Sequence, residues 1–367
     1  MRFFILGDII GHRNKMNTIY ISDGIDLDIV NELIYEFIAI GGVNGMDISI
    51  WKHTENTIIF HAFIKGLLNY KGLINEKFIL TIKNEIYDAF VNISNFSVQE
   101  KRSNVQKIFM YNEVSTFTDT HDARIEQYNE ESNNNDCCTQ ALAIGMILYG
   151  DENRDALIEL SIISSMLTHN SPTGFLGGFT SALFCALALE KVPLIKWPRI
   201  LIDHLISNKL KDISKLTIDN LNVIEDYNQY IRMWKTYVIT RFKDEHPIRN
   251  KSFSNPMHRA RYMNDNFYKD TVFGKNKQGI MGLSGYLCMI LAYDSLLECD
   301  GKFEKLLIYS IFNVVDAPSI GAVSCALYAA VYGMGDAPKS LVRVIKKKKE
   351  LSATLKIFSE KIAKLNG

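Results

Sequence analysis

The sequence has little proline and no long uninterrupted apolar run. Proline occurs seven times in 367 residues, so few positions interrupt a helix. The longest apolar stretches, such as FLGGFTSALFCALAL at 175–189, fall short of the roughly 20 residues that cross a bilayer. The start, MRFFILGDIIG, is broken by Gly-Asp before any small-residue cleavage site, and so reads as the start of a helix and not as a signal peptide. We therefore expect a soluble protein of the cytoplasm that does not bind membranes.

The sequence also lacks an excess of charge of either sign. Lys plus Arg and Asp plus Glu number 41 each, so no overall field favours nucleic acid or an anionic membrane as a partner. The six cysteines include no CxxC pair, and four of them lie in apolar segments, where cysteine behaves as a small hydrophobic residue. This usage is typical of a reducing compartment.

Three common catalytic patterns are missing as well. There is no GxxxxGK[ST] loop, no glycine-rich dinucleotide fingerprint after a strand and no GxSxG nucleophile elbow. No second histidine lies within zinc-ligand spacing of His169. These absences argue against a P-loop nucleotide hydrolase, a dinucleotide-dependent enzyme and a zinc enzyme.

What the sequence does contain is helical periodicity. Apolar residues recur at spacings of three and four, and several segments are apolar on nearly every side, so other helices must enclose them. The pattern predicts an all-α fold: a single compact multi-helix globule over residues 1–367, monomeric, with polar loops inserted near 112–136 and 243–280. The predicted helices span 27–40, 57–70, 78–90, 138–149, 154–167, 174–190, 198–207, 222–242, 284–298, 303–314, 319–333 and 348–364.

Polar residues gather at the start of one of these helices, in HTENT at 53–57. Thr54 is a suitable N-cap, and Glu55 suits the positive end of the helix dipole. Alternatively, the consecutive side-chain oxygens of Thr54, Glu55 and Asn56 could form part of a site for a hard cation. Local sequence leaves both interpretations open.

A second polar helix start lies in NVVDAPSIGAVSCALYAAVYG at 313–333. Asp316 and Ser319 stand at the entry, and Pro318 suits the first turn, where its missing N–H costs nothing. Two acidic helix starts far apart in sequence could assemble an oxygen-ligand metal site in a helical globule, although aspartate is also a common cap.

A third polar turn, MLTHNSPTGFLGGFTSALF at 166–184, contains His169. This histidine could act as a base or a ligand, but a single histidine at a turn is more often a structural hydrogen-bonding group. The glycine pair at 177 and 178 allows the following helix to pack closely.

Five segments, taken in order, resemble the ADP-ribosylglycohydrolase family, most closely its ADP-ribosylarginine hydrolase branch, including that branch's inactive, pseudoenzyme-like member. The segment at 166–184 is the most specific match, because the branch carries a near-identical Met-Thr-His-x-x-Pro-Thr-Gly sequence. The five are GDIIGHRN (7–14), HTENT (53–57), MLTHNSPTGFLGGFTSALF (166–184), MILAYDSLLECDG (289–301) and FNVVDAPSIGAVSCALYAAVYG (312–333).

The resemblance implies a compact all-α hydrolase with two magnesium ions in a cleft, which cuts the N-glycosidic bond between ADP-ribose and an arginine side chain. Its partners would be ADP-ribose or an ADP-ribosylated protein. Two hard cations can orient ribose hydroxyls and activate water. By the same resemblance, Glu55 would position the attacking water, Ser284, Gly285 and Tyr286 would contact substrate, and the metal ligands would be Thr54, Glu55, Asn56, Asp316 and Ser319.

The sequence departs from the family at the residues that matter most. Asn56 and Pro318 replace two of four carboxylates, which halves the formal ligand charge available to the cations. The family's glycine-rich substrate loop reads NNNDCCTQA at 133–141. Asp8, Asp119 and Asp136 are the carboxylates that could replace a lost ligand.

These departures predict a protein impaired or inactive in hydrolysis that retains binding of ADP-ribose or of a single magnesium ion in place of two. Two alternatives stay open: an active magnesium-dependent ADP-ribosylarginine hydrolase, and a scaffold or interaction protein in which the site has no role.

Overall fold

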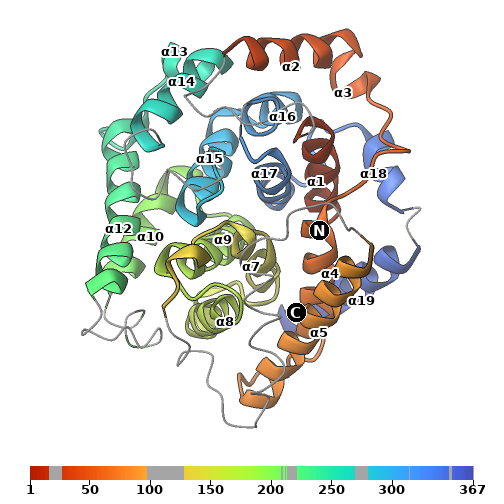
Figure 1. The fold of residues 1–367 in the computed structure, drawn as a ribbon, viewed down its shortest axis with the longest axis vertical. Helices are drawn as coiled ribbons and strands as arrows, with labels where there is room; N and C mark the ends of the chain where they lie inside the picture. The colour runs from red at the N-terminus through yellow and green to blue at the C-terminus, as the bar shows by residue number, and fades with distance from the viewer. Residues whose placement is uncertain are drawn as a thin grey trace.

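The computed structural model describes residues 1–15, 27–96, 128–207, 210, 212, 221–268, 280–313, 315–346 and 349–366. Figure 1 shows that these residues are almost wholly helical, which confirms the predicted all-α fold. The elements are α1 (Arg2–Lys15), α2 (Leu27–Ala39), α3 (Gly42–Gly45), α4 (Glu55–Leu67), α5 (Glu76–Phe96), η2 (Glu130–Ser132), α7 (Asp136–Ile147), η3 (Asp151–Asn153), α8 (Arg154–Met166), α9 (Pro172–Leu189), η4 (Leu194–Lys196), α10 (Trp197–Ile206), α12 (Leu221–Arg241), β1 (Phe242–Lys243), β2 (His246–Pro247), α13 (Lys251–Ser254), α14 (Pro256–Phe267), α15 (Gly285–Glu298), α16 (Phe303–Ser310), α17 (Ala317–Tyr332), α18 (Lys339–Lys346) and α19 (Lys349–Asn366).

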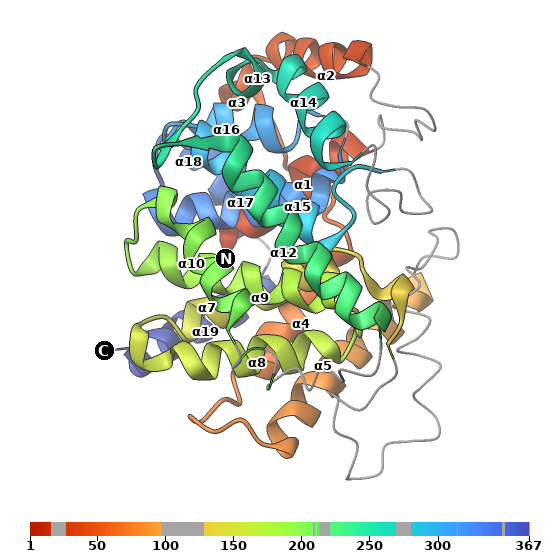
Figure 2. The ribbon, with the colours of Figure 1, turned by 90° about the vertical axis from the view of Figure 1, so that its left-hand side faces the viewer.

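Four helices with mostly buried residues, α7, α9, α15 and α17, lie at the centre of the molecule (Figure 1). Helices α10, α12 and α14 cover them on one side, and α4, α5, α18 and α19 on the other (Figures 1 and 2). Helix α9 is long and apolar enough to cross a membrane by length and composition, but 94% of that window is buried inside the protein. That burial is typical of a core helix, because a helix that is apolar all round needs neighbours on every side.

Glycines bring α1 and α17 into unusually close contact. A Cβ atom added to Gly7 would lie 2.0 Å from the Gly321 carbonyl oxygen, and one added to Gly11 would lie 2.3 Å from the Ala317 carbonyl oxygen. Any side chain at these two positions would therefore push the helices apart. Asp8 follows Gly7 on α1, and its carboxylate bonds to the start of α4.

One prediction about local structure was wrong. The segment 243–266, predicted as a loop, contains a short hairpin and the helices α13 and α14. Asn250 and Asn255 start these helices, since each side chain accepts a backbone N–H of its first turn, and Pro256 occupies the first turn of α14. Helix α18 (Lys339–Lys346) is absent from the predicted helices. Residues 112–127 and 269–279 of the predicted loops lie outside the described residues.

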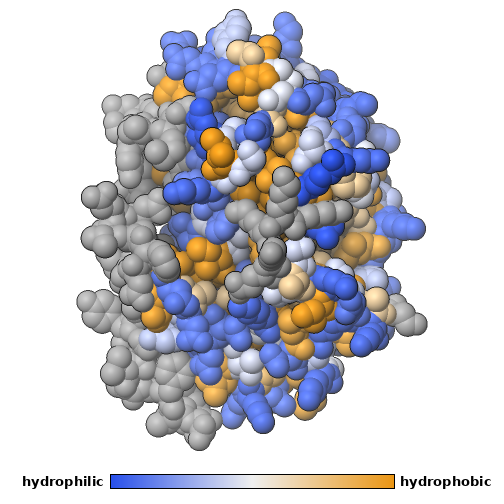
Figure 3. Space-filling view, turned by 90° about the vertical axis from the view of Figure 1, so that its right-hand side faces the viewer, coloured by the Kyte–Doolittle hydropathy of each residue, from blue (hydrophilic) through white to orange (hydrophobic). Residues whose placement is uncertain are grey.

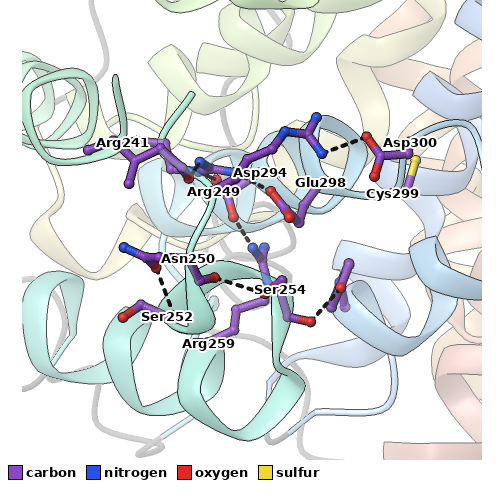
Figure 4. Close-up of polar contacts among 12 residues, drawn as sticks. Arg241, Arg249, Asn250, Ser252, Ser254, Arg259, Asp294, Glu298, Cys299 and Asp300 are labelled. Carbon is purple, nitrogen blue, oxygen red and sulfur yellow. Dashed lines mark hydrogen bonds and ion pairs between the residues drawn. The ribbon is translucent and has the colours of Figure 1, made fainter. Parts of the chain in front are cut away.

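A buried cluster of four charges joins α12, α14 and α15 (Figure 4). We call Arg241, Arg259, Asp294 and Glu298 the ionic cluster. Arg241 donates to Asp294 Oδ1 at 2.7 Å and to Glu298 Oε2 at 2.6 Å, and Arg259 donates to Asp294 Oδ2. All four side chains are almost wholly buried. Two guanidinium groups face two carboxylates, so the cluster has no formal net charge.

The surface drawn in Figure 3 carries hydrophobic residues in several separate groups between hydrophilic ones. Scattered apolar residues of this kind are ordinary on a globular protein. On this face the hydropathy pattern singles out no particular functional surface.

Candidate functional site

The start of α4 is fixed by a carboxylate from another helix. Thr54 is the N-cap, and its hydroxyl accepts the Asn56 N–H at 3.1 Å. The same hydroxyl donates to Asp8 Oδ1 at 2.6 Å, and the Thr54 N–H and the Thr57 hydroxyl donate to Asp8 Oδ2 at 3.1 and 2.6 Å. Asp8 therefore holds the first turn of α4 against α1.

Asp8 is fully buried, and within the described part of the chain its hydrogen-bond donors are neutral. Burial raises the pKa of its carboxyl to about 6, against the opposing effect of the hydrogen bonds from Thr54 and Thr57. Sequence reasoning named Asp8 only as a carboxylate that could replace a lost ligand. Both of its oxygens accept hydrogen bonds from the helix start.

The structure brings the two predicted metal motifs together. Asn56 Nδ2, at the start of α4, donates to Ser319 Oγ, in the first turn of α17, at 3.1 Å. These residues are 263 positions apart in the chain, and both are buried. The sequence-level grouping of HTENT with the start of α17 is thus matched by a direct contact.

Asp316 takes part in a different contact. Its carboxylate Oδ2 accepts the amide of Asn135, the residue that precedes α7, at 2.8 Å. The same amide nitrogen donates to the Gly282 carbonyl oxygen, also at 2.8 Å. We call Asp8, Thr54, Asn56, Thr57, Asn135, Asp316 and Ser319 the helix-start cluster, since they lie at or against the starts of α4, α7 and α17. Asn135 entered the sequence analysis only as an altered position of the substrate loop, and its bond to Asp316 was not foreseen.

The asparagine-rich segment before α7 is bonded on two further sides. Asn134 forms an isolated bridge with Ser284, and the Asn133 carbonyl accepts the Gly285 N–H at 3.0 Å. The Asn134 side-chain oxygen contacts His169 Nε2 and accepts the Asp136 N–H at 3.2 Å. The segment therefore joins the start of α15 to the turn before α9.

His169 is held as a neutral structural group. Its Nδ1 lies 2.7 Å from the Thr168 hydroxyl, and its Nε2 faces the Asn134 side-chain oxygen, so Nε2 carries the proton. Burial lowers the pKa of His169 to about 3. Both ring nitrogens are used within the protein, which favours the structural interpretation of this residue over a catalytic base.

The turn that follows His169 is fixed by Asp226 of α12, a buried carboxylate used in the same way as Asp8. Its Oδ2 accepts the Ser171 hydroxyl at 2.8 Å and the Thr173 N–H at 3.2 Å, and its Oδ1 accepts the Thr173 hydroxyl. Burial raises the pKa of Asp226, against the hydrogen bonds from Thr173 and Ser171. The starts of two helices at the site thus donate hydrogen bonds to buried acids from other helices.

The three predicted substrate-contacting residues begin α15. Ser284 is its N-cap, and among the described residues the buried Ser284 hydroxyl has no hydrogen-bond partner. A Cβ atom on Gly285 would lie 2.1 Å from the Thr173 carbonyl oxygen, so α9 approaches closely here. The Tyr286 side chain is fully buried, with its ring edge-to-face against Tyr230. The role of these residues stays a prediction.

The remaining predicted carboxylates are spread out. Glu55 is half-buried in the first turn of α4, and Asp136 opens α7. Asp119 lies outside the described residues. Within the part of the chain that the structure describes, no group of three or more His, Cys, Asp or Glu side chains could hold a metal ion.

We compared the sequence with models of known protein families, and the result agrees with the order of the motifs and with the all-helical fold. A family model described as ADP-ribosylglycohydrolase matches residues 7–366. The chain belongs to the ADP-ribosylglycohydrolase family. The resemblance predicted from the five segments is therefore confirmed.

Two relatives carry names from the same family. The chain is 29% identical over 337 residues to "Putative ADP-ribosyl glycohydrolase L444" of Acanthamoeba polyphaga mimivirus, covering 89% of this chain and 62% of that protein. It is 28% identical over 326 residues to "ADP-ribosylhydrolase ARH1" of Dictyostelium discoideum, covering 83% of this chain and 80% of that one. The chain thus spans less than two thirds of the length of the viral relative.

Proposed function

We propose that this protein is an ADP-ribosylglycohydrolase-family member that is impaired in hydrolysis and retains the capacity to bind ADP-ribose, free or attached to protein arginine. One observation carries the proposal: where the helix starts meet, side-chain amides lie against the remaining oxygen groups. The Asn56 NH2 group donates a hydrogen bond to Ser319, and the Asn135 NH2 group donates one to Asp316.

The donor set does not fit two magnesium ions. Each magnesium ion requires octahedral oxygen coordination with substantial negative charge. Of the five predicted ligands only Glu55 and Asp316 carry a carboxylate, and Pro318 offers no side-chain ligand. Because Asn56 and Asn135 direct hydrogens and not lone pairs at their partners, they compete with a cation for the same oxygens. We therefore derive no hydrolytic step through a metal centre.

The capacity to bind ADP-ribose is supported by the arrangement of helix starts. The starts of α4, α7, α15 and α17 are joined by direct hydrogen bonds or a bridge. Helix N-termini carry partial positive charge and free N–H groups, which suit a diphosphate. The buried, unpartnered Ser284 hydroxyl at the start of α15 could donate to such a ligand.

The proposal is tested by two measurements on the wild-type protein. Isothermal titration should detect ADP-ribose binding, and an assay on ADP-ribosylated arginine should detect no release of ADP-ribose above that of an Asp316→Ala variant. No ADP-ribose binding, with or without magnesium, would remove the binding half of the proposal. Turnover that needs magnesium and Asp316 would remove the other half.

A second candidate is an active ADP-ribosylarginine hydrolase, and the direct contact between the α4 and α17 motifs favours it. In that case Glu55, half-buried beside this contact, would position the attacking water. Activity should then be lost on chelation and in Glu55→Gln, with Glu304→Gln on α16 as a control outside the site. Activity that survives both changes would refute this assignment.

A further inference from the structure

The side chains of Asn135 and Asp316 do not perform the local role that their positions suggest. Both stand at N-cap positions, before α7 and α17, where asparagine and aspartate are preferred because they bond to the first-turn N–H groups. Among the described residues, neither side chain makes such a bond. The Asn135 amide instead bonds to the Asp316 carboxylate, 181 positions away.

The chemistry of the partners fixes the orientation of the Asn135 amide. The Gly282 carbonyl oxygen and the Asp316 carboxylate both accept hydrogen bonds and donate none. Turning the amide over would direct its oxygen at two other oxygens. The NH2 group therefore gives one hydrogen to each partner, and its nitrogen lies 2.8 Å from both.

The backbone brings the residues that carry these two oxygens together without Asn135. The Asp316 N–H donates to the Met281 carbonyl at 2.9 Å, which joins the start of α17 to the segment before α15. Gly282 has a φ of +89°, a conformation that favours glycine, and a Cβ there would lie 2.6 Å from Ile320 Cδ1. The Gly282 carbonyl and the backbone of Asp316 thus lie close together for reasons that do not involve the amide, and the amide bonds to both residues.

The point where they converge has the character of a cation position. Carbonyl and carboxylate oxygens are the ligands that hard divalent cations prefer, at roughly 2.0–2.6 Å. At Asn135 a neutral NH2 group occupies that point, with 1% of the residue exposed to solvent. Its two hydrogens satisfy the lone pairs that a cation would use.

We propose that Asn135 is an internal occupant of this position and is the residue that excludes a divalent cation from Asp316. The inference rests on the proposed function, because it gives the reason that this chain lacks a two-cation centre. It assigns the loss of a cation at Asp316 to one residue, Asn135, in addition to the changes within the two metal motifs.

The test is the substitution Asn135→Asp, examined with Mn²⁺ alone as the probe. The new carboxylate has the same shape as the amide, but it would place two negative charges against each other in a buried position. We expect the variant to melt below the wild type in EDTA. A cation bound between the two carboxylates would raise its Tm by about 5 °C at a Mn²⁺ concentration about a hundredfold above Kd.

The matched control is Asn134→Asp, the neighbouring residue in the same segment. Asn134 bonds to His169 through its side-chain oxygen, which aspartate retains, and among the described residues its side chain makes no hydrogen bond to Asp316. Neither this control nor the wild type should respond to Mn²⁺. A response of the control equal to that of Asn135→Asp would overturn the proposal, because it would show a general effect of added charge.

A second variant covers the case in which Asn135→Asp does not fold. Asn135→Ala removes the amide without adding charge and should bind Mn²⁺ more tightly than the wild type in isothermal titration. A folded Asn135→Asp without a Mn²⁺ response, an Asn135→Ala that binds no better than wild type, or a wild-type Mn²⁺ response that Asp316→Asn abolishes would each overturn the role of Asn135. Hydrolysis by the wild type would instead overturn the proposed function, so the two failures are distinguishable.

Discussion

The ionic cluster and the helix-start cluster stabilise their buried carboxylates in opposite ways. Asp294 and Glu298 face two guanidinium groups, and each carboxylate has an opposite charge within a hydrogen bond. Asp8 and Asp316 face hydroxyl, amide and backbone N–H groups, which are neutral. In the ionic cluster the positive and negative charges balance. In the helix-start cluster, as far as the described residues show, neutral hydrogen-bond donors stabilise the carboxylates.

The difference lies in whether an opposite charge within the protein already neutralises the buried carboxylate. A buried ion pair with good geometry locks helices together, and removing one partner leaves an uncompensated charge. A buried carboxylate without a cationic partner is what a cation site contains before the cation binds. In this chain, amides from Asn56 and Asn135 occupy that place, so the helix-start cluster is closed by hydrogen bonds and not by metal.

Asp294→Asn should have the largest effect on stability, because it leaves Arg241 and Arg259 opposite a single buried carboxylate. We expect a loss of about 3–5 kcal/mol in the free energy of unfolding, measured by urea titration. The matched control is Glu245→Gln, which breaks the exposed pair of Arg199 and Glu245 and should cost no more than about 1 kcal/mol. Equal costs for the two variants would show that the ionic cluster has no special role.

The pH dependence of unfolding tests the effect of neutral partners on a buried group at His169, which is buried among neutral partners. Its pKa is lowered to about 3, below its ordinary value, so it stabilises the fold above about pH 6.5 and this stabilisation is lost as the pH falls. Relative to His169→Gln, the wild type should lose about 2 kcal/mol between pH 7.5 and pH 5. Exposed His246→Gln is the control for a surface substitution, and this variant should still lose stability between pH 7.5 and pH 5 because it retains His169. A wild type and His169→Gln with parallel pH curves would contradict this account of His169.

Thr57→Val should have the smallest effect of the three. It keeps the shape of the side chain and removes one of the neutral donors to Asp8, which still accepts from Thr54. We expect a loss of about 1 kcal/mol in the free energy of unfolding. Thr81→Val, whose hydroxyl bonds only to its own helix at Lys77, should cost less. A cost like that of Asp294→Asn would mean that Asp8 depends on its donors as strongly as a charged pair does.

Much of the fold could be predicted because apolar periodicity marks buried helices directly. We predicted a helix that begins at residue 57, with Thr54 as a suitable N-cap. In the structure α4 begins at Glu55, and Thr54 is its N-cap. The errors lie where polar residues form helices, as in α14, whose fully buried Arg259 belongs to the ionic cluster. An arginine in a polar segment gives no local sign that it will be buried, because its partners lie on another helix.

The site was predictable in its parts but not in its pairings. The sequence placed Thr54, Asn56 and Ser319 at two helix starts, and the structure joins them. The bonds from Asp8 to Thr54 and from Asn135 to Asp316 span 46 and 181 positions, and no spacing rule reaches so far. Asp294 and Glu298 carried a usable signal, since acids four residues apart on an apolar helix need buried partners.

The most direct test of the central claim is to count the Mn²⁺ ions that wild-type protein removes from solution in the presence of ADP-ribose, by the electron paramagnetic resonance signal of free Mn²⁺. The account predicts no two-ion centre and no difference in bound Mn²⁺ between wild type and Asp316→Asn. Two Mn²⁺ ions per chain, lost in Asp316→Asn, would contradict it.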